Sequence, residues 1–275
     1  MFKSPDPSPV PAGLTYAIGD VHGRLDLLHA ALDAIARHGR GRPTRLVFLG
    51  DYVDRGPDSR GVVNLLMHLQ RQANAICLKG NHEQLMVQAV TVAERGLMER
   101  WLEFGGDATL KSYGLRPGEP PGEAIPRAHI GWMSGLPLTT ADRHRIFVHA
   151  GLAPRTAVHR QKEQSCLWIR EAFLRARSRD FEAHVVHGHT PIWEGKTEAA
   201  EPELLDHRTN LDTGAFATGT LYVGVFDSEV PGGPVELLKV QGAPMPELWP
   251  SYGRGLASTV REDRWDDARP TASPA

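Results

Sequence analysis

The sequence has little of three things that would assign it to a specialised class of protein: cysteine, net charge and long apolar runs. Only two of its 275 residues are cysteines, Cys77 and Cys166, and they lie far apart, so no structural disulfide is expected. The formal net charge of -2 gives no signal for nucleic acid as a partner. No apolar run approaches the roughly twenty residues of a membrane span, and the N-terminus lacks the apolar segment of a signal peptide. We therefore expect a soluble, cytoplasmic protein with no membrane partner.

Composition changes at both ends of the chain. Residues 1–12 are rich in proline and polar residues and are expected to form a disordered tail. Beyond residue 242 the hydrophobic periodicity is lost, so we expect residues 243–275 to form a C-terminal extension that runs across the surface. Residues 13–242 are predicted to fold as one domain.

The first part of this domain alternates predicted strands with predicted helices. Apolar runs at 14–18, 45–49 and 75–78 predict strands, and after each one apolar residues recur at helical spacing. This order predicts a parallel sheet with helical crossovers, in which ligands bind beyond the carboxyl ends of the strands. Residues 97–135 predict helices that are broken by a proline-rich loop, which could cover a site.

The second part of the domain has short apolar runs separated by turn residues. They predict strands at 136–140, 145–148, 183–186, 208–211, 220–226 and 235–240. We expect this part to be mainly antiparallel and the whole domain to contain two packed sheets. The fold class is therefore α/β.

Polar side chains with metal-binding or anion-binding chemistry follow several of these strands. They are Asp20, His22, Asp51, Asp54, Arg55, Asn81, His82, His149, His187 and His189. Carboxylate, imidazole and amide oxygen without thiolate suit manganese, iron or zinc. The set is too large for one ion, and two-metal sites hold ions about 3.5–4 Å apart across a bridging carboxylate. The sequence therefore predicts a dinuclear metal centre, with a guanidinium beside it for an anion.

Each of these motifs alone also fits an ordinary structural role. A single Asp–x–His is usually part of a loop, and a histidine at a strand end is usually a hydrogen-bonded core residue. The stretch DYVDRG alone fits a turn with a surface ion pair. Because five such motifs each follow a predicted strand, coincidence is the weaker interpretation.

Five motifs occur in a fixed order: GDVHG (19–23), GDYVDRG (50–56), GNHE (80–83), HAG (149–151) and GHT (188–190). Together they resemble those of the dinuclear metallophosphoesterases and, more narrowly, of the phosphoprotein phosphatases, the serine/threonine protein phosphatase family. The forms HGHT, NLDTGA and WLEFGGDATLKSYG resemble the bacterial and phage branch. The resemblance implies a sandwich of two mixed β-sheets flanked by helices, with residues 13–242 as the catalytic domain.

The resemblance also implies a role for each matched residue. Two divalent metal ions, with manganese preferred over iron or zinc, would be bound by Asp20, His22, Asp51, Asn81, His149 and His189, and Asp51 would bridge both. His82 would protonate the leaving group, Asp54 would hold His82, and Arg55 would bind phosphate. Arg170, in LWIRE, is the expected second phosphate ligand, with a charge on a helix surface as the alternative. His187 is expected to support the ligands from behind, with metal binding as the alternative.

The implied reaction is hydrolysis of phosphomonoesters such as phosphoserine and phosphothreonine, in which a hydroxide bridging the two metals attacks phosphorus in line. No cysteine lies in a motif loop, which favours attack by water over a thiolate nucleophile. The expected partner is a phosphorylated protein or a small phosphoester.

The alternative is symmetrical hydrolysis of diadenosine tetraphosphate or another dinucleoside polyphosphate, because the bacterial branch adjoins those hydrolases. A more remote alternative is a non-catalytic phosphate-binding scaffold, which should have lost His82 or Arg55, and both are present.

Overall fold

The structure, a computed structural model, describes residues 13–192 except 93, 95, 117, 118, 120, 122 and 123, and residues 201–245. The predicted tail (1–12) and most of the predicted C-terminal extension lie outside the described residues, and the domain boundaries stay a prediction. Within the described ranges, every helix is too short or too polar to cross a bilayer.

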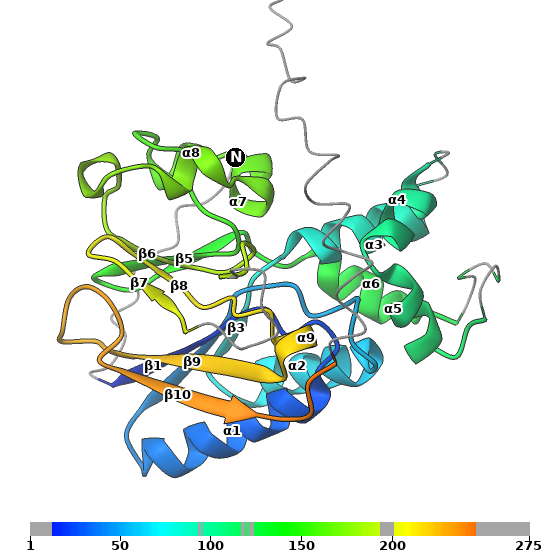
Figure 1. The fold of residues 1–275 in the computed structure, drawn as a ribbon, viewed down its shortest axis with the longest axis horizontal. Coiled ribbons are helices and arrows are strands. Elements are labelled where there is room, and N and C mark those ends of the chain that lie inside the picture. Colours follow the sequence, from blue (N-terminus) through cyan, green and yellow to red (C-terminus); the bar gives the residue numbers. More distant parts are fainter. Residues whose placement is uncertain are drawn as a thin grey trace, which may run out of the picture.

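Two five-stranded sheets pack against each other at the centre of the fold (Figure 1). The first sheet has the strand order β10-β9-β1-β2-β3. Its strands are β1 (Leu14–Ile18), β2 (Thr44–Phe48), β3 (Ala75–Cys77), β9 (Thr220–Asp227) and β10 (Glu236–Gln241). The strands β1, β2 and β3 pair in parallel, as predicted, and β9 is antiparallel to both of its neighbours.

The second sheet has the order β4-β5-β6-β8-β7. Its strands are β4 (Thr139–Ala141), β5 (Arg145–Val148), β6 (His184–His187), β7 (Glu203–Leu204) and β8 (Arg208–Asn210). The expectation that the second part is mainly antiparallel is wrong for the centre of this sheet, where β5, β6 and β8 pair in parallel. Parallel pairing needs long crossovers, and the one from β5 to β6 contains helices of only four and six residues, too short for a clear periodicity.

The interface between the sheets is filled by apolar side chains from both. Ala17, Val47 and Phe226 of the first sheet pack with Phe147 and Val186 of the second. The rings of Phe147 and Phe226 meet edge to face with their centroids 5.8 Å apart. This packing fixes the position of one sheet relative to the other and therefore aligns the loops at their strand ends.

Helices cover the outer faces of the two sheets and form a lobe at one side (Figure 1). The crossover helices α1 (Leu25–Gly39) and α2 (Ser59–Gln72) pack on the first sheet, and the side chain of Asp58 caps α2 by accepting the Gly61 N–H at 2.7 Å. The lobe contains α3 (Asn81–Thr91), α4 (Leu97–Glu103), α5 (Gly106–Ser112) and α6 (Arg127–Ser134). The last three of these helices confirm that residues 97–135 contain helices, and part of the predicted proline-rich loop between them lies outside the described residues.

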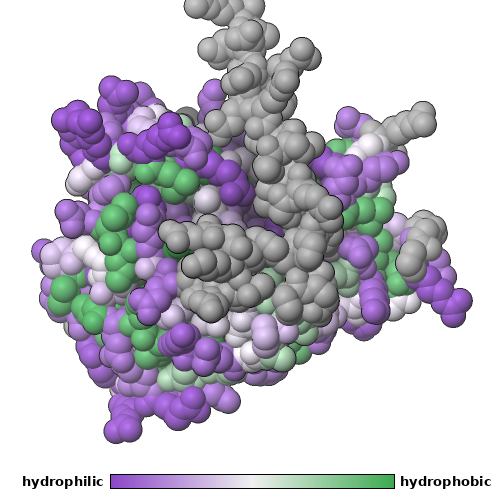
Figure 2. Space-filling view, viewed as in Figure 1, coloured by the Kyte–Doolittle hydropathy of each residue, from purple (hydrophilic) through white to green (hydrophobic). Residues whose placement is uncertain are grey.

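The remaining helices are short and were not predicted. They are α7 (Glu163–Trp168), α8 (Glu171–Leu174), α9 (Ala215–Thr218) and the 3-10 turns η1 (Val158–Arg160) and η2 (Ser178–Asp180). On the face seen in Figure 2, the described residues are mostly hydrophilic, and the hydrophobic ones occur in small groups between them.

Candidate metal centre and phosphate site

The five motif loops begin at or just after the carboxyl ends of β1, β2, β3, β5 and β6, and these ends lie together where the two sheets meet. Backbone hydrogen bonds join the loops: the N–H groups of Val21 and His22 donate to the Asp51 carbonyl at 3.1 and 2.9 Å, and Gly188 donates to the His149 carbonyl at 2.8 Å. The structure therefore brings the predicted site residues, Arg170 included and His187 excepted, into one connected network of side-chain and backbone contacts.

The backbone is unusual at the same loops. Among the described residues, seven other than glycine have positive φ, and five of them are predicted site residues: His22, Asp51, Asp54, Arg55 and His189. A side chain in this left-handed region costs about 1–2 kcal/mol, so the surrounding structure must enforce it. Backbone strain of this kind occurs most often at functional sites, where several side chains must point toward one position.

Four ligand atoms converge on one position. His149 Nε2 lies 2.9 Å from Asn81 Oδ1, 3.2 Å from His189 Nδ1 and 3.3 Å from Asp51 Oδ1. His149 donates its Nδ1–H to the Leu49 carbonyl at 2.9 Å, so its Nε2 presents a lone pair to the two oxygens. Acceptors that face one another at such distances suit a shared cation, because ligands about 2.1 Å from one ion lie about 3–3.5 Å apart.

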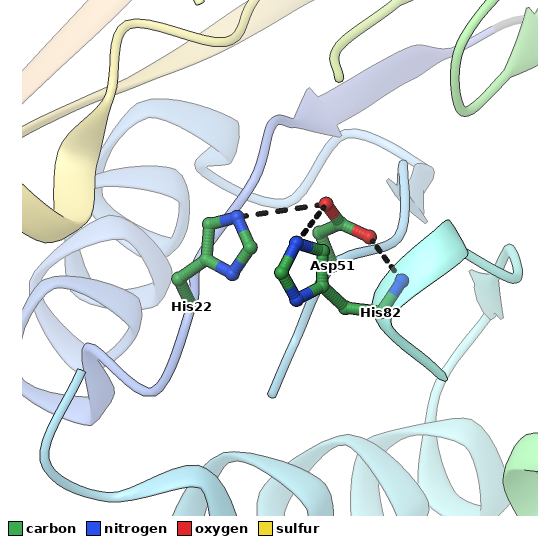
Figure 3. Close-up of side chains that lie close together, drawn as sticks. All are labelled: His22, Asp51 and His82. Atoms are coloured by element: carbon green, nitrogen blue, oxygen red, sulfur yellow. Dashed lines mark hydrogen bonds and ion pairs between the residues drawn. The ribbon is translucent and has the colours of Figure 1, made fainter. Parts of the chain in front are cut away.

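A second group, formed by His22 and His82, lies at the other carboxylate oxygen of Asp51 (Figure 3). His22 donates its Nδ1–H to the Val53 carbonyl at 2.8 Å, which aims its Nε2 at Asp51 Oδ2, 3.5 Å away. Asp20, the remaining predicted ligand, belongs to neither group, and both of its oxygens accept the backbone N–H of His189, at 3.2 and 3.1 Å. Asp51 thus contributes one oxygen to each group, as a bridging residue must.

Burial sets the charges of these groups. The six predicted metal ligands are all buried, and burial lowers the pKa of His149 to about 4 and raises the pKa of Asp51 to about 7. The pKa of Asp20 is also raised, by burial and then by the nearby carboxylates of Asp212 and Asp51. Neutral imidazoles are ligands, and a divalent cation would favour the ionised carboxylates, so the residues fit a dinuclear metal centre.

His82 lies beside this centre and contacts Asp54. Its Nδ1–H donates to Asp54 Oδ2 at 2.7 Å, and both side chains are almost completely buried. The ring Nε2 faces Asp51 Oδ2 at 3.7 Å (Figure 3), and the backbone N–H donates to Asp51 Oδ1 at 3.1 Å. The pair therefore has the arrangement of an oriented acid, with one ring nitrogen held and the other directed at the site.

Two guanidinium groups border the centre. Arg55 lies with Nη1 2.8 Å from His22 Nε2 and Nη2 3.0 Å from His82 Nε2. Arg170, between α7 and α8, donates to the His189 carbonyl at 3.3 Å and to Thr190 Oγ1 at 3.5 Å. Arg170 is only partly exposed, so it is not a freely solvated charge on a helix surface.

His187 faces away from the metal ligands. Its Nδ1–H donates to the Gly188 carbonyl at 3.1 Å, its Nε2 lies 3.4 Å from Arg208 Nη1, and its ring packs on Phe173. Two residues apart on one strand, His187 and His189 would point to the same side, but β6 ends at His187 and His189 has a φ of 65°. This geometry fits a role for His187 in supporting the predicted metal ligands from behind, rather than in binding metal.

Two buried carboxylates of the site were not predicted. Glu83 accepts the backbone N–H groups of Asp51, Tyr52 and Gly80 at 2.8–2.9 Å and so fixes the loop that carries the predicted bridging carboxylate. Asp212 follows β8, and its charge acts on Asp20, Asp51 and Arg170. The rule that selected the other residues, a polar side chain just after a strand, would have found Asp212.

Replacing Arg170 with alanine should weaken substrate binding without removing the metals. A charge-assisted hydrogen bond is worth about 1.5–3 kcal/mol, so kcat/KM should fall about 10- to 100-fold and inorganic phosphate should inhibit more weakly. Steady-state kinetics and manganese titration calorimetry measure the two effects. Arg175→Ala, at an exposed position on the C-terminal side of α8, is the control. An unchanged inhibition constant for phosphate in Arg170→Ala would contradict the phosphate-binding role.

Comparisons with known proteins support the resemblance. Residues 14–217 match the family model described as calcineurin-like phosphoesterase. The chain is 30% identical over 184 residues to serine/threonine-protein phosphatase 1 of Salmonella typhimurium, covering 64% of this chain and 78% of that protein. It is 25% identical over 223 residues to the asymmetrical bis(5'-nucleosyl)-tetraphosphatase PrpE of Oceanobacillus iheyensis, covering 72% and 82%.

Two further matches concern the alternative activity and the fold. A symmetrical bis(5'-nucleosyl)-tetraphosphatase of Dechloromonas aromatica is 29% identical over 173 residues, covering 63% of this chain and 55% of that protein. A protein serine/threonine phosphatase of Saccharomyces cerevisiae with similarity to human phosphatase PP5 aligns with a TM-score of 0.56 at 16% identity, covering 87% and 83%. The latter match supports the fold of two mixed sheets flanked by helices.

Proposed function

The chain belongs to the calcineurin-like phosphoesterase family, and from this premise we propose that it is a metal-dependent phosphomonoester hydrolase acting on phosphoserine and phosphothreonine in proteins. The family and its phosphatase-named relatives make it a hydrolase. The choice among phosphate substrates depends on the residues around the metal centre.

The proposed metal ligands are Asp20, His22, Asp51, Asn81, His149 and His189, and manganese is the preferred metal, with iron or zinc as alternatives. When bound, two such ions supply positive charge to the phosphoryl oxygens and lower the pKa of a water molecule. Arg55 and Arg170 can donate hydrogen bonds to the remaining phosphate oxygens, because both guanidinium groups border the centre.

The observation that carries the proposal is the buried pair of His82 and Asp54. A departing serine or threonine alkoxide is strongly basic, so it leaves far more readily when an acid protonates it. The nucleotide that leaves from a dinucleoside polyphosphate is a weak base, so protonation accelerates its departure much less. A site that keeps an oriented imidazole beside the metals is therefore better matched to alkyl phosphomonoesters.

A second candidate is the hydrolysis of dinucleoside polyphosphates. Two relatives of similar identity carry names for this activity, one symmetrical and one asymmetrical. The same metal ligands would serve both reactions. The two activities would differ in the segments that cover the site, 97–135 and 191–208, because these would select the substrate. Parts of both segments lie outside the described residues.

A substrate panel separates the two candidates. Purified protein with manganese should hydrolyse phosphoserine and phosphothreonine peptides with a higher kcat/KM than diadenosine tetraphosphate, because the acid accelerates departure of the alkoxide and accelerates departure of the nucleotide much less. Phosphate release measures the first activity and nucleotide chromatography the second. Release of two ADP molecules would indicate symmetrical cleavage, and AMP with ATP would indicate asymmetrical cleavage. A preference for the dinucleotide would overturn the phosphoprotein proposal.

A further inference from the structure

The turn between α4 and α5 packs directly against the loop that carries Asp54 and Arg55. The backbone N–H of Arg55 donates to the Gly105 carbonyl at 3.1 Å. Gly106 follows in the same turn, and a Cβ there would lie 2.6 Å from the Trp101 ring, so only glycine lets that ring pack so closely. The segment WLEFGGDAT is therefore built to hold Trp101 against the Asp54 loop.

Trp101 and Thr109 supply the hydrogen bonds that surround the Asp54 carboxylate. Trp101 Nε1 lies 3.0 Å from both carboxylate oxygens, and the Thr109 hydroxyl donates to Oδ1 at 2.6 Å. The Oδ2 atom also accepts the Nδ1–H of His82. Trp101, Thr109 and Asp54 are completely buried, so these donors take the place of water around the carboxylate.

The Thr109 hydroxyl also fixes the backbone of Asp54. Its Oγ1 accepts the Asp54 N–H at 2.8 Å, while Ser59 Oγ lies 3.0 Å from the same N–H and 2.9 Å from Thr109 Oγ1. Asp54 has a φ of 71°, a conformation that needs such support. Thr109 therefore holds both the main chain and the side chain of Asp54.

These contacts also affect the charge of the carboxylate. Burial raises the pKa of Asp54, and the hydrogen bonds from Thr109 and Trp101 oppose that rise. An ionised carboxylate accepts the His82 Nδ1–H more strongly than a neutral one does. The two donors thus favour the form of Asp54 that orients the imidazole.

We propose that Trp101 and Thr109 are positioning residues for leaving-group protonation, acting through Asp54 on His82. The proposal rests on the proposed hydrolase function. As the phosphorus–oxygen bond breaks, the oxygen keeps the electron pair and takes a proton from His82 Nε2, which leaves the imidazole neutral. Trp101 and Thr109 touch neither substrate nor metal ligands in this step. They keep the Nδ1 side of the ring bound to Asp54, so that Nε2 stays directed at the site.

Thr109→Val tests the proposal most directly, because it keeps the shape of the side chain and removes the hydroxyl. With manganese-loaded protein, kcat on a phosphoserine peptide should fall about tenfold or more, since general acids contribute about 10²- to 10⁴-fold. On p-nitrophenyl phosphate, whose leaving group needs little protonation, kcat should fall no more than about twofold. Thr109→Ser, which restores the hydroxyl, should return both values to those of the wild type.

Trp101→Phe is the second variant and should show the same selective loss, because it removes only the indole N–H and part of the ring. Thr91→Val on α3 and Trp132→Phe on α6 are matched controls that lose a hydroxyl or an indole N–H elsewhere in the lobe. If Thr109→Val does not fold, Trp101→Phe decides the question. Equal losses on the two substrates, or no loss on the peptide, would overturn the proposal.

Manganese titration calorimetry on the same proteins separates this proposal from the underlying function. The variants should bind manganese as tightly as the wild type, because neither residue touches a predicted metal ligand. If the wild type hydrolyses neither substrate, the proposed function fails. If the wild type is active and the variants lose alkyl and aryl activity alike, only the positioning role fails.

Discussion

Asp51→Asn is expected to lower turnover at least about a thousandfold and to leave the fold largely intact. Asp51 lies between two groups of ligand atoms, with Oδ1 3.3 Å from His149 Nε2 and Oδ2 3.5 Å from His22 Nε2. An amide has nearly the same shape but no negative charge to hold two dications. Metal ions contribute several kcal/mol to such reactions, and each 1.36 kcal/mol corresponds to a factor of ten.

Metal content and kinetics together test this expectation. Manganese bound per chain, measured by calorimetry and elemental analysis, should fall below the wild-type value in Asp51→Asn. Asp107→Asn, at an exposed position on α5, is the charge-matched control and should behave as wild type. Circular dichroism should show the same secondary structure in all three proteins. Near-normal activity of Asp51→Asn with manganese would show that the bridging assignment is wrong.

His82→Asn should separate substrates by their leaving groups. Loss of the acid should cost about 10²- to 10⁴-fold in kcat on an alkyl phosphate such as a phosphoserine peptide. An aryl phosphate should lose much less, because its leaving group is stable as an anion. Asparagine is smaller than histidine but can still hydrogen-bond in the space beside Asp54 Oδ2, where Nδ1 now lies at 2.7 Å.

The comparison requires both substrates to be measured with the same metal-loaded protein. His68→Asn, at an exposed position on α2, controls for the loss of an imidazole far from the site. Manganese affinity should be retained in His82→Asn, since the predicted ligands are unchanged. Losses of equal size on the alkyl and aryl substrates would show that His82 is not the general acid.

The site could be located from the sequence because its residues obey a local rule. Asp20, Asp51, Asn81 and His149 each follow a buried strand within four residues, and parallel strands bring such positions to one edge. The same local patterns placed β1 and β5 at their observed bounds. What is encoded within about ten neighbouring residues was therefore predictable.

Features that depend on distant packing were not predictable in this way. The parallel pairing of β5 with β6 depends on a crossover whose helices, α7 and α8, are too short to show a periodicity. The support of Asp54 by Trp101 and Thr109 joins residues 47 and 55 positions apart, and it exists only because the helical lobe folds back onto the DYVDRG loop. No local sequence pattern predicts this strand pairing or these hydrogen bonds.

The two sheets contribute unequal parts of the predicted metal centre. The loops after β1, β2 and β3 carry the predicted ligands Asp20, His22, Asp51 and Asn81, and those after β5 and β6 carry His149 and His189. An ion bound by both sets cross-links the halves of the sandwich. Binding to the folded state alone adds about 2.7 kcal/mol of stability when the ligand is at a hundred times its dissociation constant. If these residues hold metal as predicted, the folded chain should therefore be more stable with metal than without it, and metal starvation should lower the stability of the fold as well as its activity.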